Sequence, residues 1–280
     1  MLSPSSIPLF DAELPGRLVL CAEYNLHNRI LSATMGARSR FDSLRIRLGL
    51  LRRERALKRA VRHAAGIQCN GRVAYDAYSS LNDHSLLFFD SRVAESTIPK
   101  QTRPLHSTLQ LAFSGRLIPQ KGVLDAVEAF SLARRRGLHA DLHIFGDGEL
   151  ANRIPRADPN IIVHGLVPYR PDWVDFMSSE IDALLIPHRQ GDPSCTYIEG
   201  MGCGLPFISY ANDSATHMAK QSSAGWTVPV GDTEALAQLL LNVGRDHERI
   251  LAAKHAALTF ARQYSFERVS AMRAAHLRTC

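Results

Sequence analysis

The sequence lacks the marks of several protein classes. No apolar run approaches the roughly 20 residues that cross a bilayer, and the opening MLSPSSIPLFDAELPG lacks the basic stretch and apolar core of a secretory signal. The five cysteines are scattered, with no C-x-x-C pair, which argues against a disulfide framework or a zinc site and favours a reducing cytoplasm. Only His139 and His143 have a spacing that could bind a metal, and the strand-like HADLHIFG around them predicts no metal site.

Positive charge is concentrated in one segment. Residues 38–62 hold ten basic and two acidic residues in a chain whose formal net charge is +6. Four apolar residues recur there at helical spacing: Phe41, Leu44, Leu48 and Leu51. The favoured interpretation is a solvated helix that packs this stripe on its own domain. Peripheral contact with an anionic membrane is the alternative, and nucleic acid is a weaker third, because no interleaved aromatic residues offer stacking platforms.

The apolar pattern changes near residue 108. The segment 98–108, IPKQTRPLHST, has two prolines and no apolar period, which is typical of a linker. After it, apolar strands alternate with helices, which predicts a parallel sheet covered on both faces. We therefore expect an α/β fold: a partial first domain with linker over 1–107, a complete Rossmann-like domain over 108–264 and a C-terminal helix over 265–280. Before the linker only RLVLCAEY and AAGIQCNG read as strands, so the first domain is expected to be truncated.

Two cations follow the first strand of the second domain. Arg116 comes directly after a strand-ending Ser-Gly, and Lys121 opens the next helix. Ligands bind parallel sheets at the carboxyl ends of the strands, and two cations there suit a polyphosphate. The Walker spacing is absent, and FGDGE at 145–149 is explained by a tight turn between strand and helix.

The segment DPSCTYIEGMGCGLP, residues 192–206, adds a short helix at the same edge. Ser194 is the expected cap, and the amides of the first turn, near Cys195 and Thr196, favour an anion. Glu199 lies three residues after Thr196 and is expected to accept hydrogen bonds from hydroxyl groups. The cations Arg116 and Lys121 suit a diphosphate, and the carboxylate of Glu199 suits a ribose. Together they predict a nucleotide-diphosphate pocket.

Several motifs carry a family resemblance. They are GR-x4-KG at 115–122, FGDGEL, VHGLVP, IEGMGCGLPFISY, AGWTVPVGD and YSFERV. With them, the segment from about residue 109 to 265 resembles the C-terminal domain of a GT-B-fold glycosyltransferase of the retaining family 4, or group 1, type. This resemblance implies metal-independent and cofactor-free transfer of a sugar, with retention, from a UDP- or GDP-linked donor to a glycan or lipid-linked acceptor. The expected place is the cytoplasm, with peripheral contact to the inner face of the membrane as a further possibility.

The resemblance also implies residue roles. Arg116 and Lys121 would hold the donor diphosphate and stabilise charge on it as it departs, and Glu199 would hold the ribose. The family often has a second glutamate in contact with the donor sugar, and Asp192 lies beside that position here. The expected donor-binding residues are Gly115, Gly165, Leu166, Val167, Asp192, Ser194, Cys195 and Thr196.

The sequence fits two other enzyme classes less well. An epimerase of the same fold would need added groups for proton abstraction, and a dehydrogenase would need G-x-G-x-x-G after the first strand. His27 and Glu23 are the nearest substitutes for the acceptor-side residues of the family. The remaining alternative is a truncated or divergent chain that binds nucleotide without turnover. We expect this chain to bind nucleotide with transfer near background, and an upstream-extended form to be active.

Overall fold

The structure is a computed structural model that describes residues 17–34, 39–191, 193 and 195–280. The chain forms two compact units. The first unit holds the chain up to Asp90, the short segment Gln190–Pro193 and the C-terminal Phe266–Cys280. The second unit holds Ser91–Arg189 and Ser194–Ser265. The C-terminal segment therefore belongs to the same unit as the N-terminal strands.

The first unit is built on a three-stranded parallel sheet in the order β1-β2-β3. Sequence analysis predicted only two strands and missed β3, whose four residues SLLF are mostly half-exposed and have no strong alternation. The elements of this unit are β1 (Val19–Ala22), α1 (Leu26–Thr34), α2 (Arg40–His63), β2 (Gly66–Asn70), α3 (Arg72–Tyr78), β3 (Ser85–Phe88) and α10 (Phe266–Thr279).

A small core and a buried ion pair stabilise the first unit. Leu57 and Val61 of α2 pack with Ile67 of β2. Beside this core, Arg29 of α1 pairs with the buried carboxylate of Glu54, and the hydroxyl of Tyr78 donates to the same carboxylate at 3.2 Å. The ion pair thus ties α1 to α2, while Tyr78 adds the end of α3.

Helix α10 is joined to the sheet by a reciprocal hydrogen-bond pair. The Nε of Arg273 donates to Gln68 Oε1 at 2.9 Å, and Gln68 Nε2 donates to the carbonyl oxygen of Arg273 at 3.0 Å. The guanidinium of Arg273 also lies over the ring of Phe88, 4.2 Å from its centroid. These contacts attach α10 to β2 and β3.

The predicted basic helix exists as α2, but its apolar stripe is not packed on its own unit. The exposed fractions are 76% for Phe41, 55% for Leu44, 51% for Leu48 and 42% for Leu51. The favoured interpretation of the stripe was therefore wrong. Only the C-terminal part of α2 buries side chains, namely Glu54, Leu57 and Val61.

The second unit is a six-stranded parallel sheet in the order β6-β5-β4-β7-β8-β9. The inner strands are mostly buried, as expected for a sheet covered on both faces, whereas the edge strands β6 and β9 are mostly half-buried. Its main elements are β4 (Leu109–Ser114), α4 (Val123–Arg135), β5 (Ala140–Phe145), β6 (Ile161–Gly165), α5 (Val174–Glu180), β7 (Ala183–Leu185), α6 (Cys195–Gly202), β8 (Phe207–Tyr210), α7 (Asp213–Ser222), β9 (Gly225–Val228), α8 (Thr233–Arg245) and α9 (His247–Gln263).

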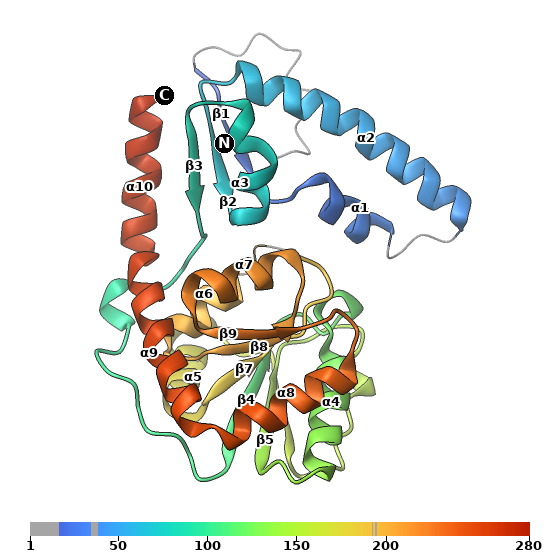
Figure 1. Ribbon diagram of the computed structural model, residues 1–280, viewed down its shortest axis with the longest axis vertical. Helices are drawn as coiled ribbons and strands as arrows, with labels where there is room; N and C mark the ends of the chain where they lie inside the picture. Colours follow the sequence, from blue (N-terminus) through green and yellow to red (C-terminus); the bar gives the residue numbers. More distant parts are fainter. Residues whose placement is uncertain (1–16, 35–38, 192, 194) are drawn as a thin grey trace. The chain divides into compact units, whose positions relative to one another are not determined.

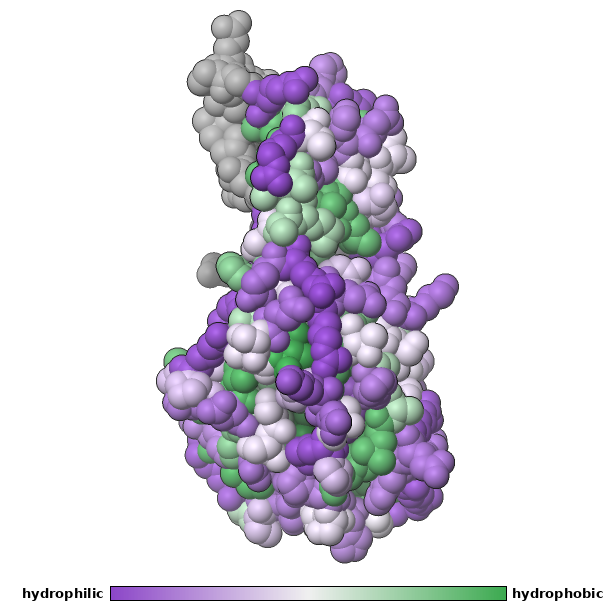
Figure 2. All heavy atoms as spheres, turned by 90° about the vertical axis from the view of Figure 1, so that its left-hand side faces the viewer, coloured by the Kyte–Doolittle hydropathy of each residue, from purple (hydrophilic) through white to green (hydrophobic). Residues whose placement is uncertain are grey.

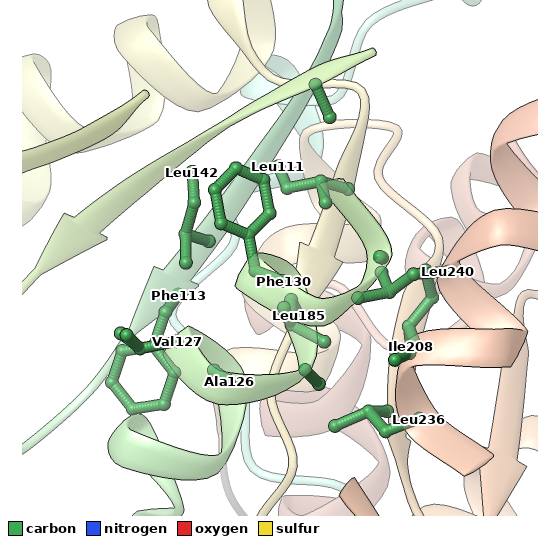
Figure 3. Close-up of a cluster of buried hydrophobic side chains, with 14 of the residues drawn as sticks. Leu111, Phe113, Ala126, Val127, Phe130, Leu142, Leu185, Ile208, Leu236 and Leu240 are labelled. Atoms are coloured by element: carbon green, nitrogen blue, oxygen red, sulfur yellow. The ribbon is translucent and has the colours of Figure 1, made fainter. Parts of the chain in front are cut away.

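Helices α4 and α8 lie side by side over one face of this sheet (Figure 1). Phe130 of α4, Leu111 of β4 and Leu240 of α8 are fully buried in the core that they form with the strands (Figure 3). Elsewhere in the unit α6 packs against α9, and Gly200 of α6 leaves no room for a side chain beside Leu184 of β7. The close packing of α6 fixes the residues on it.

No helix in the described ranges has the length and apolar character needed to cross a membrane. Polar residues cover most of the face shown in Figure 2, and apolar residues form only small separate groups on it.

Candidate functional site

The loops that follow β4, β5 and β6 are joined by backbone hydrogen bonds at the carboxyl edge of the large sheet. The amide of Gly115 donates to the carbonyl of Phe145 at 3.1 Å, and the amide of Gly146 donates to the carbonyl of Gly165 at 2.7 Å. Gly146 has a φ of +124°, and a Cβ on it would lie 1.9 Å from the carbonyl oxygen of Gly115. The glycine in FGDG is therefore needed for close approach of two loops.

Lys121 lies at the same edge, next to the end of β7. It ends a short helical turn, Pro119–Lys121, and is only 6% exposed. The next residue, Gly122, has a φ of +68°, and a Cβ there would lie 2.1 Å from the carbonyl oxygen of Pro187. This contact presses the turn that carries Lys121 against the loop after β7.

Arg189 fastens that loop to α4. Its guanidinium donates two hydrogen bonds of 2.7 Å to the carboxylate of Asp125, and its amide donates to the carbonyl of Gln120 at 3.0 Å. The two-pronged geometry fixes both partners. Sequence analysis missed this pair, since the two residues are 64 positions apart.

Glu199 lies on α6, and its side chain is only 6% exposed. A Cβ on Gly202 would lie 2.6 Å from Val93 Cγ1, so α6 is held against the segment before β4 at the turn that follows Glu199. The helix ends at Gly202, shortly before Gly204-Leu205-Pro206, a sequence that favours the end of a helix.

The carboxylate of Glu199 has one strong partner, which sequence analysis missed. The Nε of Arg92 donates to Glu199 Oε1 at 2.7 Å, and this hydrogen bond raises the pKa of Arg92. The Arg92 guanidinium also lies over the ring of Tyr169, 4.0 Å from its centroid. Burial, with the Glu199 carboxylate as a second cause, raises the pKa of Tyr169.

Tyr169 connects this pair to the end of β4. Its ring stacks on Trp173 at a centroid distance of 5.5 Å, and Trp173 Nε1 donates to Ser114 Oγ at 2.9 Å. Ser114 immediately precedes Gly115. A chain of contacts thus runs along the carboxyl edge from β4 through the loop after β6 to Glu199.

The predicted site residues differ in exposure. Arg116 and Leu166 are exposed, whereas Gly115, Gly165, Val167, Cys195 and Thr196 are half-buried. Asp192 and Ser194 lie outside the described residues, so the predicted sugar contact and helix cap stay predictions. His27 and Glu23 are exposed residues of the first unit.

A family model for glycosyl transferases group 1 matches residues 108–246. This segment is a group 1 glycosyltransferase domain. It contains β4 to α8, and with them the edge that carries Arg116, Lys121 and Glu199.

Curated relatives match the same half of the chain. The chain is 27% identical over 152 residues to the amylovoran biosynthesis glycosyltransferase AmsK of Erwinia amylovora. It is 23% identical over 146 residues to the capsular polysaccharide biosynthesis glycosyltransferase CapM of Staphylococcus aureus. Each match covers 50% of this chain and 37% of the relative.

Solved structures match nearly the whole chain. TarM superposes with a TM-score of 0.70 at 13% identity, covering 99% of this chain and 53% of TarM. Alr3699/HepE of Anabaena, crystallised with UDP, superposes with a TM-score of 0.70 at 18% identity. This match covers 99% of this chain and 75% of Alr3699/HepE. With its two parallel sheets, the chain has the GT-B fold, as the sequence predicted.

Proposed function

We propose that the protein transfers a sugar from a nucleotide-diphosphate donor to a glycan or lipid-linked acceptor, with retention and without a metal or other cofactor. The observation that carries this proposal is the joined edge of the group 1 domain. At this edge the strand end before Arg116 is connected to the helix that bears Glu199. The connection runs from Ser114 to Trp173, from there to Tyr169, and through Arg92 to Glu199. Lys121 lies at the same edge. Ligands of parallel α/β sheets bind at this edge.

Arg116 and Lys121 are proposed to bind the donor diphosphate. The exposed guanidinium of Arg116 offers hydrogen-bond donors in a planar fork, which matches phosphate oxygens. Lys121 is held close to the end of β7 by the contact between Gly122 and Pro187. Both cations would stabilise negative charge as it develops on the leaving diphosphate, so they would lower the barrier as well as bind.

The other donor groups have proposed partners on the neighbouring loops. Glu199 would accept hydrogen bonds from the ribose hydroxyls, and the loop Gly165, Leu166, Val167 would contact the base. Backbone amides at Cys195 and Thr196 would contact the phosphates near the start of α6. Gly115 would admit the diphosphate close to the backbone, while Asp192 and Ser194 keep the roles proposed from sequence.

A UDP-linked donor is the first choice to test, with GDP second. Structures of Alr3699/HepE contain UDP, UDP-glucose, or UDP with glucose. A TarM mutant was crystallised with UDP and α-GlcNAc-glycerol. The names of AmsK and CapM point to polysaccharide biosynthesis for those relatives, which supports a glycan or lipid-linked acceptor here.

An anionic membrane surface is the second proposed partner, through residues 38–62. The observation that favours it is the exposed stripe of α2, in which Leu44 and Leu48 lie among arginines such as Arg45 and Arg52. Apolar residues flanked by basic ones are typical of helices that lie in the interface of anionic membranes. The proposed place is therefore the cytoplasmic face of a membrane.

The donor pocket is tested by calorimetric titration with UDP and GDP. Arg116→Ala and Lys121→Ala should each weaken nucleotide binding by about 1.5–3 kcal/mol, the scale of a charge-assisted hydrogen bond, which is roughly 10- to 150-fold in Kd. Chelation of divalent metal by EDTA should leave binding unchanged. Arg135→Ala, at the far end of α4 and exposed, is the matched control and should bind as the wild type does.

The same titration can contradict the assignment of Arg116 and Lys121 to the donor diphosphate. If the Arg116 and Lys121 double variant is folded and binds UDP and GDP undiminished, the pocket lies elsewhere. Turnover is measured separately, as sugar release and transfer from a panel of nucleotide-sugars. Binding without either activity would favour the alternative, a nucleotide-binding chain without turnover.

A further inference from the structure

Arg92 lies where it can control the carboxylate of Glu199. The two residues are 107 positions apart in the chain, and their contact joins the segment before β4 to α6. Arg92 engages one oxygen, Oε1, through its Nε. The side chain of Arg92 is 60% exposed, whereas that of Glu199 is 6% exposed. The pair therefore has a buried acid and a cation at the solvent side.

The segment around Arg92 is itself held in place. Val93 is buried against Gly202, one turn after Glu199 on α6, and its amide donates to Ser91 Oγ at 3.1 Å. These contacts fix the backbone on both sides of Arg92. The side chain then extends between Glu199 and the ring of Tyr169.

Tyr169 provides the second support for Arg92. The guanidinium lies 4.0 Å from the centroid of the tyrosine ring, within the range of a cation–π interaction. The ring in turn stacks on Trp173, which is anchored to Ser114. Arg92 is therefore fixed by a stacked ring as well as by the hydrogen bond.

This arrangement has a chemical consequence for Glu199. A buried carboxylate is costly unless a cation or hydrogen-bond donors compensate it, and Arg92 supplies that compensation. A carboxylate has about four acceptor sites on two oxygens. Among the described residues the hydrogen bond of Arg92 is made at Oε1, which leaves Oε2 able to accept from a ligand hydroxyl. Arg92 thus sets the orientation of the acid.

We propose that Arg92, stacked on Tyr169, is a positioning residue that presets Glu199 to bind the ribose hydroxyls of the donor. The inference rests on the proposed role of Glu199 in the nucleotide pocket. It adds a residue that no motif marked and that acts through Glu199. It also links ribose recognition to Tyr169, which follows the loop proposed to contact the base.

The test is a titration of the variants with three probes: UDP, 2′-deoxy-UDP and inorganic pyrophosphate. Arg92→Ala should weaken UDP at least 10-fold, weaken 2′-deoxy-UDP less, and leave pyrophosphate within 2-fold. Arg92→Lys keeps the charge but loses the planar contact with Tyr169 and should be intermediate. Arg135→Ala is the matched control, because Arg135 is exposed at the far end of α4, and it should bind all three probes as the wild type does.

A double variant separates positioning from a merely structural role. Arg92→Ala in a Glu199→Gln background should cost no further UDP affinity, because its effect passes through the carboxylate.

The outcomes distinguish an error in the ribose assignment of Glu199 from an error in the role of Arg92. If Glu199→Gln leaves UDP binding intact, the ribose assignment is wrong. If Glu199→Gln weakens UDP but a folded Arg92→Ala does not, the ribose assignment stands and the role of Arg92 is wrong. Equal loss of UDP and pyrophosphate in Arg92→Ala would also overturn the inference, since that result indicates damage to the whole site.

Discussion

Helices α2 and α8 show how differently the two units use an apolar stripe. Both helices repeat apolar residues at helical spacing. Helix α8 buries five residues in the core of the large sheet: Leu236, Ala237, Leu240, Leu241 and Val243. Helix α2 is almost twice as long, yet it buries only Glu54, Leu57 and Val61. Amphipathic periodicity therefore predicts a stripe but does not predict what covers it.

The length of α2 accounts for its uncovered part. The 24 residues of α2 make a helix about 36 Å long, whereas the four or five residues of β1, β2 and β3 span only about 13–17 Å. Only the C-terminal part of α2, with Leu57 and Val61, packs in the core of this sheet. The N-terminal half of α2, with Phe41 and Leu44, is the half that stays uncovered.

The largest expected effect is in the core of the large sheet. Phe130 is fully buried between α4 and the strands, so Phe130→Ala should lower the free energy of unfolding by about 3–5 kcal/mol. Leu48→Ala on α2 should change it by no more than about 0.5 kcal/mol, because the side chain is already 51% exposed. Denaturant unfolding checks the first change by tryptophan fluorescence, since both tryptophans, Trp173 and Trp226, are in the second unit.

Far-UV circular dichroism measures the change in unfolding free energy of Leu48→Ala. A loss of 2 kcal/mol or more in Leu48→Ala would mean that the stripe is covered within the chain. A small loss in Phe130→Ala would mean that the core around α4 is less tightly packed than its full burial indicates.

Much of the second unit could be predicted because its signals are local. The alternation of strands and helices that the sequence predicts after residue 108 is present from β4 to α8. A local cap also marks the start of α8, where the carboxylate of Asp232 accepts from the amide of Ala235. In the first unit β3 was missed, because a run of four residues, of which three are half-exposed, carries too weak a pattern.

The sequence predicts only those site residues that follow a recognisable strand or lie on a recognisable helix. Arg116 follows a recognisable strand, and Glu199 lies on a helix with a marked start and end. Arg92 has no such signal, because its partner is 107 residues away and only the packing of Val93 on Gly202 brings them together. Tyr169 directly follows VHGLVP and could have been considered from that position.

A smaller effect is expected from acid on the large sheet. Burial, together with the neighbouring His164, lowers the pKa of His143 from 6.5 to about 4. The folded state therefore binds fewer protons than the unfolded state between pH 6.5 and 4, so stability is fully present above 6.5 and is lost as the pH falls toward 4. The slope should stay below about 1.4 kcal/mol per pH unit, the limit for one proton, because solvent screens a half-buried ring.

Removal of the ring checks this source of acid sensitivity. His143→Gln should flatten the dependence of unfolding free energy on pH between 7 and 5. His255→Gln, on the exposed side of α9, is the matched control and should leave the dependence as it is. If both variants behave like the wild type, the acid sensitivity comes from other groups.

The smallest effect on stability, and the clearest on binding, is expected on α2. Leu44→Gln with Leu48→Gln should change the unfolding free energy by no more than about 0.5 kcal/mol, since both side chains are more than half exposed. Burial of one leucine in a membrane interface contributes about 1.5–3 kcal/mol, so the double variant should lose at least 10-fold in binding to vesicles that contain anionic lipid. Co-sedimentation with vesicles of phosphatidylglycerol and phosphatidylcholine measures this loss, and vesicles of phosphatidylcholine alone should bind poorly because the arginines of α2 have no anionic partner there.

Leu251→Gln with Leu277→Gln, at exposed leucines on α9 and α10, should bind as the wild type does. Equal binding to both kinds of vesicle, or a variant that still binds, would remove the membrane as the partner of the stripe. A wild-type oligomer that dissociates in the variant would instead identify a second copy of the chain as the cover.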